Sequence, residues 1–232
     1  MKTKKGAPTI STHDLAKMID HTLLKPEATE QQVYKLCNEA VENGFGAVCV
    51  NPCWVKTCAR SLEGSGVKVA TVIGFPLGAT TTAAKRAEAV EALKSGAEEL
   101  DMVLNIGQLK SGLLSAAMKD MRSLARLAHI HGALLKVILE TCLLSEEEKV
   151  VACKLAMQAG ADFVKTSTGF STGGATVEDV ALMRETVGPE LGVKASGGIR
   201  TYEDALKMVK AGANRIGCSA GVQILKEAKA AE

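Results

Sequence analysis

A short, mostly apolar run led by a glycine recurs along the chain, and it constrains the fold more than any other feature. These runs cover residues 44–50, 66–75, 96–104, 132–140, 160–167, 192–198 and 212–219, and an eighth candidate lies at 18–22. Glycine suits the left-handed turn that ends a helix, and a short apolar run suits a buried strand. The repeat therefore predicts eight strands separated by helices.

The segments between these runs carry helix-start signals. Thr29, Ser145, Thr176 and Thr201 are each followed three residues later by Gln, Glu or Asp, which is the pattern of an N-terminal helix cap. Strands that alternate with helices form parallel sheets, because each return to parallel pairing needs a crossover.

Eight such strands favour a closed (β/α)8 TIM barrel, an α/β fold, over an open doubly wound sheet. The 232 residues are close to the length typical of that barrel, and no G-x-G-x-x-G dinucleotide loop follows the first strand. We expect residues 1–10 to form a flexible lead-in and residues 11–232 to form a single barrel domain. A short helix near Ser11–Lys17 is predicted to cover the bottom of the barrel.

Composition excludes several classes of function. The net charge is only +2 and aromatic residues make up 3%, which argues against nucleic acid as a partner. The basic N-terminus lacks an apolar signal core, and no stretch of ~20 apolar residues is present, so we expect a cytoplasmic protein that does not enter a membrane. The seven cysteines do not have zinc-site spacing, and no metal is predicted.

Charged residues interrupt strands that should be apolar. They stand at Asp101, Lys136, Lys165 and Lys194, and further acids stand at Asp20 and Glu140. An unpaired charge inside a strand buried on both faces costs several kcal/mol or changes its protonation state. Three lysines on neighbouring strands, near the end where barrel active sites form, favour a functional cluster over a purely structural ion-pair network.

Two adjacent buried lysines can support nucleophilic catalysis. An amine attacks a carbonyl only when it is uncharged, and burial beside a second cation lowers its pKa from about 10.4 towards neutrality. One lysine would then form an imine while a nearby carboxylate passes protons. Such a site needs no metal or other cofactor.

Small residues close the last three strands and predict an anion site. They occur at 165–169, 196–198 and 217–219, where backbone amides lie beside the starts of helices. In TIM barrels the loops after the last two strands often bind phosphate. Tight turns use the same residues, so turn formation alone remains an alternative explanation for Ser-Gly-Gly at 196–198.

Eight strings of the sequence resemble the deoxyribose-phosphate aldolases in order and spacing. They are IDHTLLKPEAT, AVCVNP, ATVIGFPLGATTTAAK, ELDMVLNIG, LKVILET, DFVKTSTGF, KASGGIRT and NRIGCSAG, and they run from about residue 18 to residue 220. The resemblance implies a class I aldolase, an aldehyde-lyase that reversibly cleaves 2-deoxy-D-ribose 5-phosphate to D-glyceraldehyde 3-phosphate and acetaldehyde. It also implies that no metal takes part and that the substrates are the partners.

The resemblance also implies roles for individual residues. Lys165 would be the Schiff-base nucleophile, Lys194 the second lysine that lowers its pKa and transfers protons, and Asp101 the acid/base partner. Residues near the substrate would be Asp20, Thr22, Cys49, Lys136 and Thr168. Phosphate would be bound by Gly169, Gly197, Gly198, Gly217 and Ser219.

The chain departs from some family members beside the phosphate loops. Phe170 replaces a lysine, and Ala220 replaces a second serine. These changes predict a weaker preference for phosphorylated substrates and acceptance of short, unphosphorylated aldehydes.

Two alternative functions remain open from the sequence. One is a different Schiff-base barrel aldolase of phosphorylated sugars, and the other is a barrel that binds phosphosugars without turnover. Barrels commonly pair, so we expect a homodimer or homotetramer.

Overall fold

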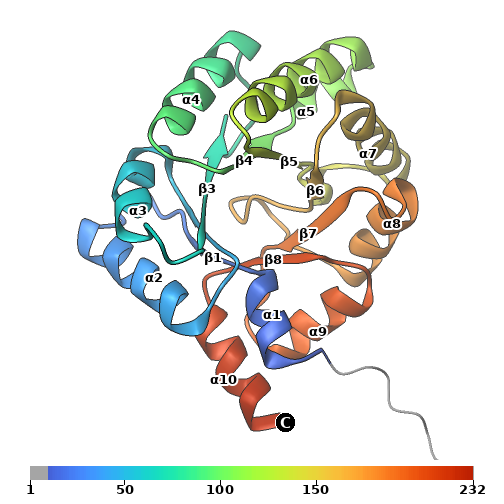
Figure 1. The fold of residues 1–232 in the computed structure, drawn as a ribbon. Helices are drawn as coiled ribbons and strands as arrows, with labels where there is room; N and C mark the ends of the chain where they lie inside the picture. Colours follow the sequence, from blue (N-terminus) through green and yellow to red (C-terminus); the bar gives the residue numbers. More distant parts are fainter. Residues whose placement is uncertain (1–9, 232) are drawn as a thin grey trace, which may run out of the picture.

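The computed structural model describes residues 10–231 and contains a closed barrel of eight parallel strands, in the order β1 to β8, with β8 paired to β1 (Figure 1). The strands are β1 (Ile19–Leu23), β2 (Ala47–Val50), β3 (Lys68–Ile73), β4 (Glu99–Val103), β5 (Leu134–Ile138), β6 (Phe163–Lys165), β7 (Gly192–Ser196) and β8 (Arg215–Cys218). The predicted (β/α)8 barrel is confirmed, and each strand lies within one residue of its predicted run. Most of the predicted lead-in, residues 1–9, lies outside the described residues.

Helices surround the barrel in a ring, as Figure 1 shows. The α-helices are α1 (Thr12–Met18), α2 (Glu30–Asn43), α3 (Val55–Ser61), α4 (Thr82–Lys94), α5 (Ile106–Lys110), α6 (Leu114–Ile130), α7 (Glu146–Ala159), α8 (Val177–Val187), α9 (Tyr202–Lys210) and α10 (Gly221–Ala231). Two 3-10 helices are η1 (Pro52–Trp54) and η2 (Thr141–Leu143). Each of the described helices is too short or too polar to cross a membrane.

The predicted caps begin four of these helices. Thr29, Ser145 and Thr201 each form a capping box with the residue three positions later, and the Thr176 side chain accepts a hydrogen bond from the Asp179 N–H. These bonds satisfy N–H groups that have no partner inside the helix. The helix boundaries that follow bring each strand back to the barrel in parallel.

The helix α1 lies at the amino-terminal end of the barrel, as predicted. It is capped by Ser11 and runs directly into β1. Gly46, just before β2, donates its N–H to the Ala16 carbonyl at 3.2 Å. A Cβ at Gly46 would lie 2.2 Å from the Lys17 carbonyl oxygen, so glycine is required for this close approach.

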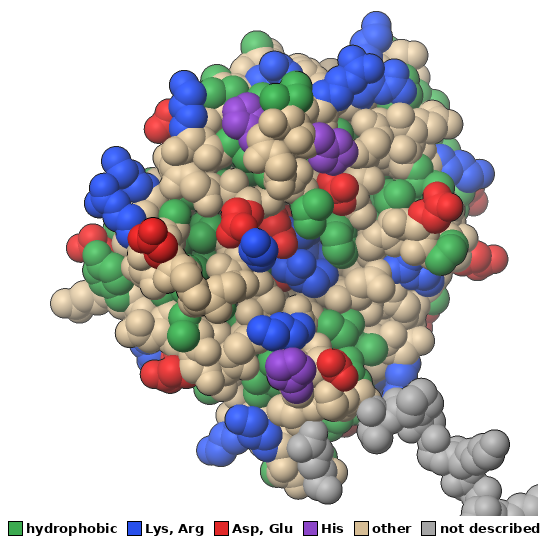
Figure 2. Space-filling model, viewed as in Figure 1, with side chains coloured by type: hydrophobic (Ala, Val, Ile, Leu, Met, Phe, Trp, Pro, Cys, Tyr) green, Lys and Arg blue, Asp and Glu red, His purple; other side chains and the backbone are tan. Residues whose placement is uncertain are grey.

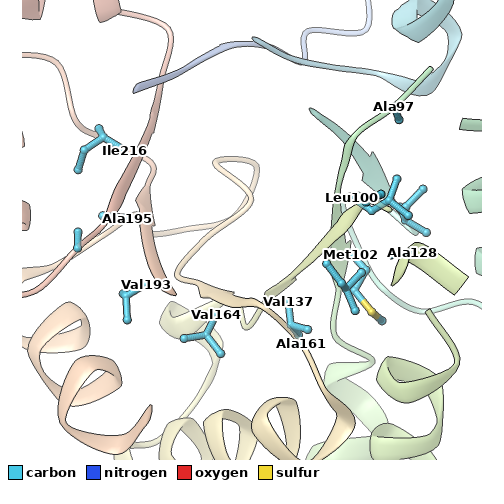
Figure 3. Packing of buried hydrophobic residues seen from close by; sticks show 14 of the residues in the cluster. Ala97, Leu100, Met102, Ala128, Val137, Ala161, Val164, Val193, Ala195 and Ile216 are labelled. Atoms are coloured by element: carbon cyan, nitrogen blue, oxygen red, sulfur yellow. The ribbon is translucent and has the colours of Figure 1, made fainter. Parts of the chain in front are cut away.

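The two faces of the barrel strands differ in chemistry. On the outer face, apolar side chains such as Leu100, Met102, Val137 and Val164 pack against the helices (Figure 3). Because side chains alternate between faces, the charged residue between Leu100 and Met102 points into the barrel. The inner face therefore carries the charges that the sequence analysis identified.

The barrel interior is itself divided into two parts. Strands β2 and β3 contribute a small apolar cluster that includes Ala47, Cys49, Ala70 and Val72. Strands β1, β4, β5, β6 and β7 contribute buried acidic and basic side chains, and β8 contributes the partly buried Arg215. Figure 2, viewed as in Figure 1, shows acidic and basic side chains beside one another over the middle of the molecule.

Candidate active site

Strand register brings the four predicted charged residues together. Asp101 of β4 pairs with Lys136 of β5, and Lys165 of β6 pairs with Lys194 of β7. All four side chains are at least 97% buried. The lysines that the sequence placed on neighbouring strands therefore share one enclosed site.

The carboxylate of Asp101 joins the three lysines. Its Oδ2 accepts hydrogen bonds from Lys165 Nζ and Lys194 Nζ, each at 2.8 Å, and its Oδ1 accepts one from Lys136 Nζ at 2.7 Å. Charge-assisted bonds of this length are strong in a dry interior. However, the two lysines that share Oδ2 compete for the same negative charge.

Lys165 is the lysine of this site whose pKa is lowered. Burial disfavours its charged form and is the larger cause; Asp101 opposes this effect, and the nearby Lys194 adds to it. The expected influence of Lys194 therefore acts in addition to burial. An amine with a lowered pKa is the form of lysine that attacks a carbonyl.

The neighbours of Lys165 remain charged. Burial acts against the charge of Lys194 and Lys136, but the surrounding carboxylates outweigh it and raise the pKa of both. Burial acts against the charge of Asp101 as well, yet Lys136, Lys165 and Lys194 hold its pKa well below the ordinary value. The site thus contains an amine with a lowered pKa, that of Lys165, beside a lysine and a carboxylate that both favour their charged forms.

A pocket of about 400 Å³ opens above Lys165. Its wall contains eight of the predicted site residues, which are Thr22, Lys165, Thr168, Gly169, Gly197, Gly198, Gly217 and Ser219. The pocket lies at the carboxyl ends of the strands, where TIM-barrel sites are built. Its volume is in the range of small-molecule sites.

Backbone geometry at the predicted phosphate site favours glycine. Gly169, Gly197 and Gly198 have φ angles of 84°, 90° and 83°. A Cβ at Gly197 would also lie 2.9 Å from the Gly174 Cα. The loops can therefore approach a ligand with bare backbone amides.

Five predicted site residues do not reach the pocket wall. Asp20, Cys49, Lys136, Asp101 and Lys194 are fully buried beneath it. Burial raises the pKa of the Cys49 thiol, which lies among the small apolar residues of β2 and β3. In this structure Asp101 contacts Lys165 directly, and the other four lie in the layer below the pocket.

The sequence analysis missed two cationic residues of the pocket wall, Lys25 and Arg200. They lie in the same wall as Ser196 of the predicted anion loop at 196–198, whose hydroxyl is buried and has no hydrogen-bond partner among the described residues. Lys25 and Arg200 lie in segments without periodicity, so only their adjacency to IDHTLL and SGG could have indicated them. Two cations offset part of the charge that Phe170 does not supply.

Glu140, noted as a strand-end acid, supports the pocket from outside. Its carboxylate accepts hydrogen bonds from the Thr168 N–H at 3.2 Å and from the Thr168 hydroxyl. The same hydroxyl accepts the Phe170 N–H at 3.0 Å, and Phe170 packs edge-on against Phe75. Glu140 has a φ of 58°, a strained conformation for a residue with a side chain.

No group of three or more His, Cys, Asp or Glu side chains within residues 10–231 is arranged to hold a metal ion. All seven cysteines are free of disulfides.

Comparison with known proteins gives consistent matches along the chain. The model of the DeoC/LacD family aldolase matches residues 15–228. The deoxyribose-phosphate aldolase of Brevibacillus brevis is 63% identical over 216 residues, which cover 93% of this chain and 97% of the relative. That of Thermococcus gammatolerans is 62% identical over 221 residues, covering 94% and 98%.

A solved structure also matches over nearly the whole chain. It is the tetrameric structure of deoxyribose phosphate aldolase from Aeropyrum pernix, with 39% sequence identity and a TM-score of 0.89. The match covers 96% of this chain and 94% of that one.

Proposed function

Because the chain belongs to the DeoC/LacD family of aldolases, we propose that it is a deoxyribose-phosphate aldolase. The reaction is the reversible cleavage of 2-deoxy-D-ribose 5-phosphate to D-glyceraldehyde 3-phosphate and acetaldehyde. The observation that carries the proposal is the amine of Lys165, which faces the pocket, lies beside Asp101 and Lys194 and has a lowered pKa.

Lys165 is the nucleophile in this proposal. Its uncharged amine adds to the C1 aldehyde of the open-chain sugar, and loss of water gives an imine. Loss of the C3 hydroxyl proton breaks the C2–C3 bond, releases glyceraldehyde 3-phosphate and leaves an enamine. Protonation of the enamine carbon and hydrolysis then release acetaldehyde and restore the free amine.

Asp101 and Lys194 handle the protons of these steps. Asp101 contacts both amines through one oxygen, so it can accept a proton at one stage and return it at another. Lys194 stays protonated, disfavours protonation of Lys165 and supplies a proton to the relay. A water within the pocket would connect these groups to the substrate.

The glycine loops and the cations at the pocket wall would hold the phosphate. Backbone amides of Gly169, Gly197 and Gly198 and the Ser219 hydroxyl provide donors, and Arg200 provides charge. Thr22 and Thr168 would contact the sugar. Asp20, Cys49 and Lys136 would support the site from beneath the pocket.

The proposed enzyme works without a metal or other cofactor in the cytoplasm. A homodimer or homotetramer is the proposed assembly, and the tetrameric relative from Aeropyrum pernix supports the larger one.

Borohydride reduction in the presence of acetaldehyde, followed by peptide mass mapping, tests the proposal. The expected result is an ethyl adduct on Lys165, absent without acetaldehyde and absent in Lys165→Leu. Lys68→Leu is the matched control, because Lys68 is half-exposed at the amino-terminal end of β3 and its loss should leave the adduct intact.

Other results would favour the two alternatives. Binding of the phosphosugar with no trapped adduct from either aldehyde or sugar would indicate a binding protein. An adduct formed from a different carbonyl donor, but not from acetaldehyde, would indicate another Schiff-base aldolase.

A further inference from the structure

Six charged side chains form a closed ring inside the barrel, alternating in sign. In order around the ring they are Arg215, Glu99, Lys136, Asp101, Lys194 and Asp20. Every neighbouring pair is in direct ion-pair contact, and the ring spans β8, β4, β5, β7 and β1. Two of its members, Glu99 and Arg215, have no role in the chemistry described above.

Arg215 closes the ring with a forked contact. Its guanidinium donates to Asp20 Oδ1 from Nε at 2.7 Å and also from Nη2. The same group donates to both oxygens of Glu99, at 3.2 and 3.1 Å. A planar guanidinium can bridge two carboxylates in this way, whereas a single ammonium presents no such fork.

Glu99 connects this fork to the catalytic carboxylate. Its Oε2 lies 2.6 Å from Lys136 Nζ, and Lys136 Nζ in turn lies 2.7 Å from Asp101 Oδ1. Lys136 is fully buried and also lies 3.8 Å from Asp20. The position of Asp101 is therefore fixed from the side opposite Lys165.

The ring is separated from the substrate. None of its six members contributes to the described pocket wall, which Lys165 reaches from below. With the carboxylates ionised, the three acids of the ring balance its three bases. Lys165 is the seventh ionisable group of the cluster and shares the Asp101 oxygen that already contacts Lys194.

We propose that Glu99 and Arg215 are positioning residues of the aldolase site: they close the ring of ion pairs that holds Asp101 and Lys194 against Lys165. The inference rests on the proposed function of Lys165. In a self-neutral ring no carboxylate is left over for Lys165, so its uncharged form is the one that the surroundings favour.

Charges face Lys165 from most of the surrounding strands. Beyond the ring partners already given, the Cys49 thiol on β2 is a further titratable group near Lys165, while β3 contributes the apolar side chains of Ala70 and Val72 to the interior. Opening the ring at Glu99 removes a negative charge, and opening it at Arg215 removes a positive one. The two changes should therefore move the proton affinity of Lys165 in opposite directions.

The test uses Glu99→Gln, Arg215→Gln and the double variant. For each variant, the rate at which acetaldehyde forms an adduct on Lys165 is measured across pH by trapping with borohydride. Glu99→Gln should move the acid limb to lower pH and Arg215→Gln to higher pH, each by roughly half to one pH unit. The double variant should return close to the wild-type profile.

Glu98→Gln is the matched control. Glu98 precedes Glu99 in the chain but forms a half-exposed ion pair with Lys68, at 2.6 Å. The same chemical change there should leave the acid limb in place. A purely structural role for the ring would lower stability or yield in the Glu99 and Arg215 variants without moving their limbs apart.

Two outcomes would overturn the proposal. One is an unshifted limb in both single variants, and the other is a shift in the same direction in both. If Arg215→Gln does not fold, Glu99→Gln decides alone, and a limb equal to that of Glu98→Gln contradicts the proposal. A wild-type enzyme without any adduct would instead refute the proposed function, which separates the two failures.

Discussion

Two regions of this molecule bury a lysine against an aspartate, and they treat it differently. Between α4 and α6, Lys85 is fully buried, lies 2.6 Å from Asp120 Oδ2 and donates to the Val103 carbonyl at 2.8 Å. In the barrel, Lys165 lies 2.8 Å from Asp101 Oδ2, an oxygen that Lys194 also occupies. No second lysine within the described residues contacts the two acceptors of Lys85, whereas Lys165 shares its carboxylate oxygen with Lys194.

This difference separates a structural lysine from a chemical one. When a buried ammonium has its own carboxylate and carbonyl, removing one partner leaves the other polar group buried and uncompensated. For Lys165, burial lowers the pKa, and its one carboxylate, shared with Lys194, does not outweigh that effect. Lys165, which is of the second kind, also faces a pocket.

The largest expected effect is at Lys165, the lysine that shares its carboxylate. Lys165→Leu should reduce kcat by about 10⁴-fold or more, because the buried amine beside Asp101 is lost and the other lysine of the pocket wall, Lys25, is exposed to solvent. The melting temperature should change little, because Asp101 keeps Lys136 and Lys194 as partners. Activity assays measure the expected loss of kcat, and thermal unfolding of the same preparation measures the melting temperature. Retained turnover would contradict the distinction between the two lysines.

The cationic neighbour gives the next effect. Lys194→Leu should lower kcat by roughly two to three orders of magnitude and shift the acid limb of the pH–rate profile upward. The sign follows because loss of Lys194 removes a nearby cation and frees Asp101 Oδ2 for Lys165, and both changes raise the Lys165 pKa. A pH–rate profile with an unchanged acid limb would contradict this role.

At Lys85, which does not share its carboxylate with a second lysine, a substitution should lower stability and not activity. Lys85→Met removes the partner of Asp120, whose Oδ1 already lacks a hydrogen bond, and should cost about 3–5 kcal/mol of unfolding free energy. The folded fraction should keep its kcat. Urea unfolding measures the loss, with Lys68→Met of the exposed Lys68–Glu98 pair as a control expected to lose at most about 1 kcal/mol.

The sequence predicted the shared lysine but not the unshared one, and the reason is physical. Lys165 and Asp101 stand out because they interrupt apolar strands, where a charge needs an explanation. Lys85 lies in the helical segment TTTAAK, where a lysine ordinarily faces solvent; its burial depends on how α4 packs against α6.

The same reasoning explains the other unpredicted parts of the site. Glu99 and Arg215 begin their strands, where charged residues are common, so their inward direction depends on barrel closure and register. The role of Glu140 depends on a positive φ angle that no residue pattern indicates. The glycine-led repeat, in contrast, predicted the barrel because glycine is favoured at the left-handed turns that end helices, so it marks the start of each new strand.

The smallest expected effect concerns the loop above the shared lysine. Glu140→Gln places an amide N–H opposite the Thr168 donors, and the poorer match should loosen residues 168–170. We expect KM for deoxyribose 5-phosphate to rise about tenfold, with little change in acetaldehyde trapping on Lys165. Steady-state kinetics with both substrates measure this split, and Glu147→Gln on exposed α7 is the control.

The central claim is that the barrel holds the Lys165 amine uncharged closer to neutral pH than an ordinary lysine. It is tested most directly by NMR titration of lysine side chains labelled with ¹³C at Cε, with the Lys165 signal assigned through Lys165→Arg. The account predicts a midpoint below the ordinary value of about 10.4, while the Lys194 signal does not titrate in that range. A Lys165 midpoint at or above the ordinary value would contradict it.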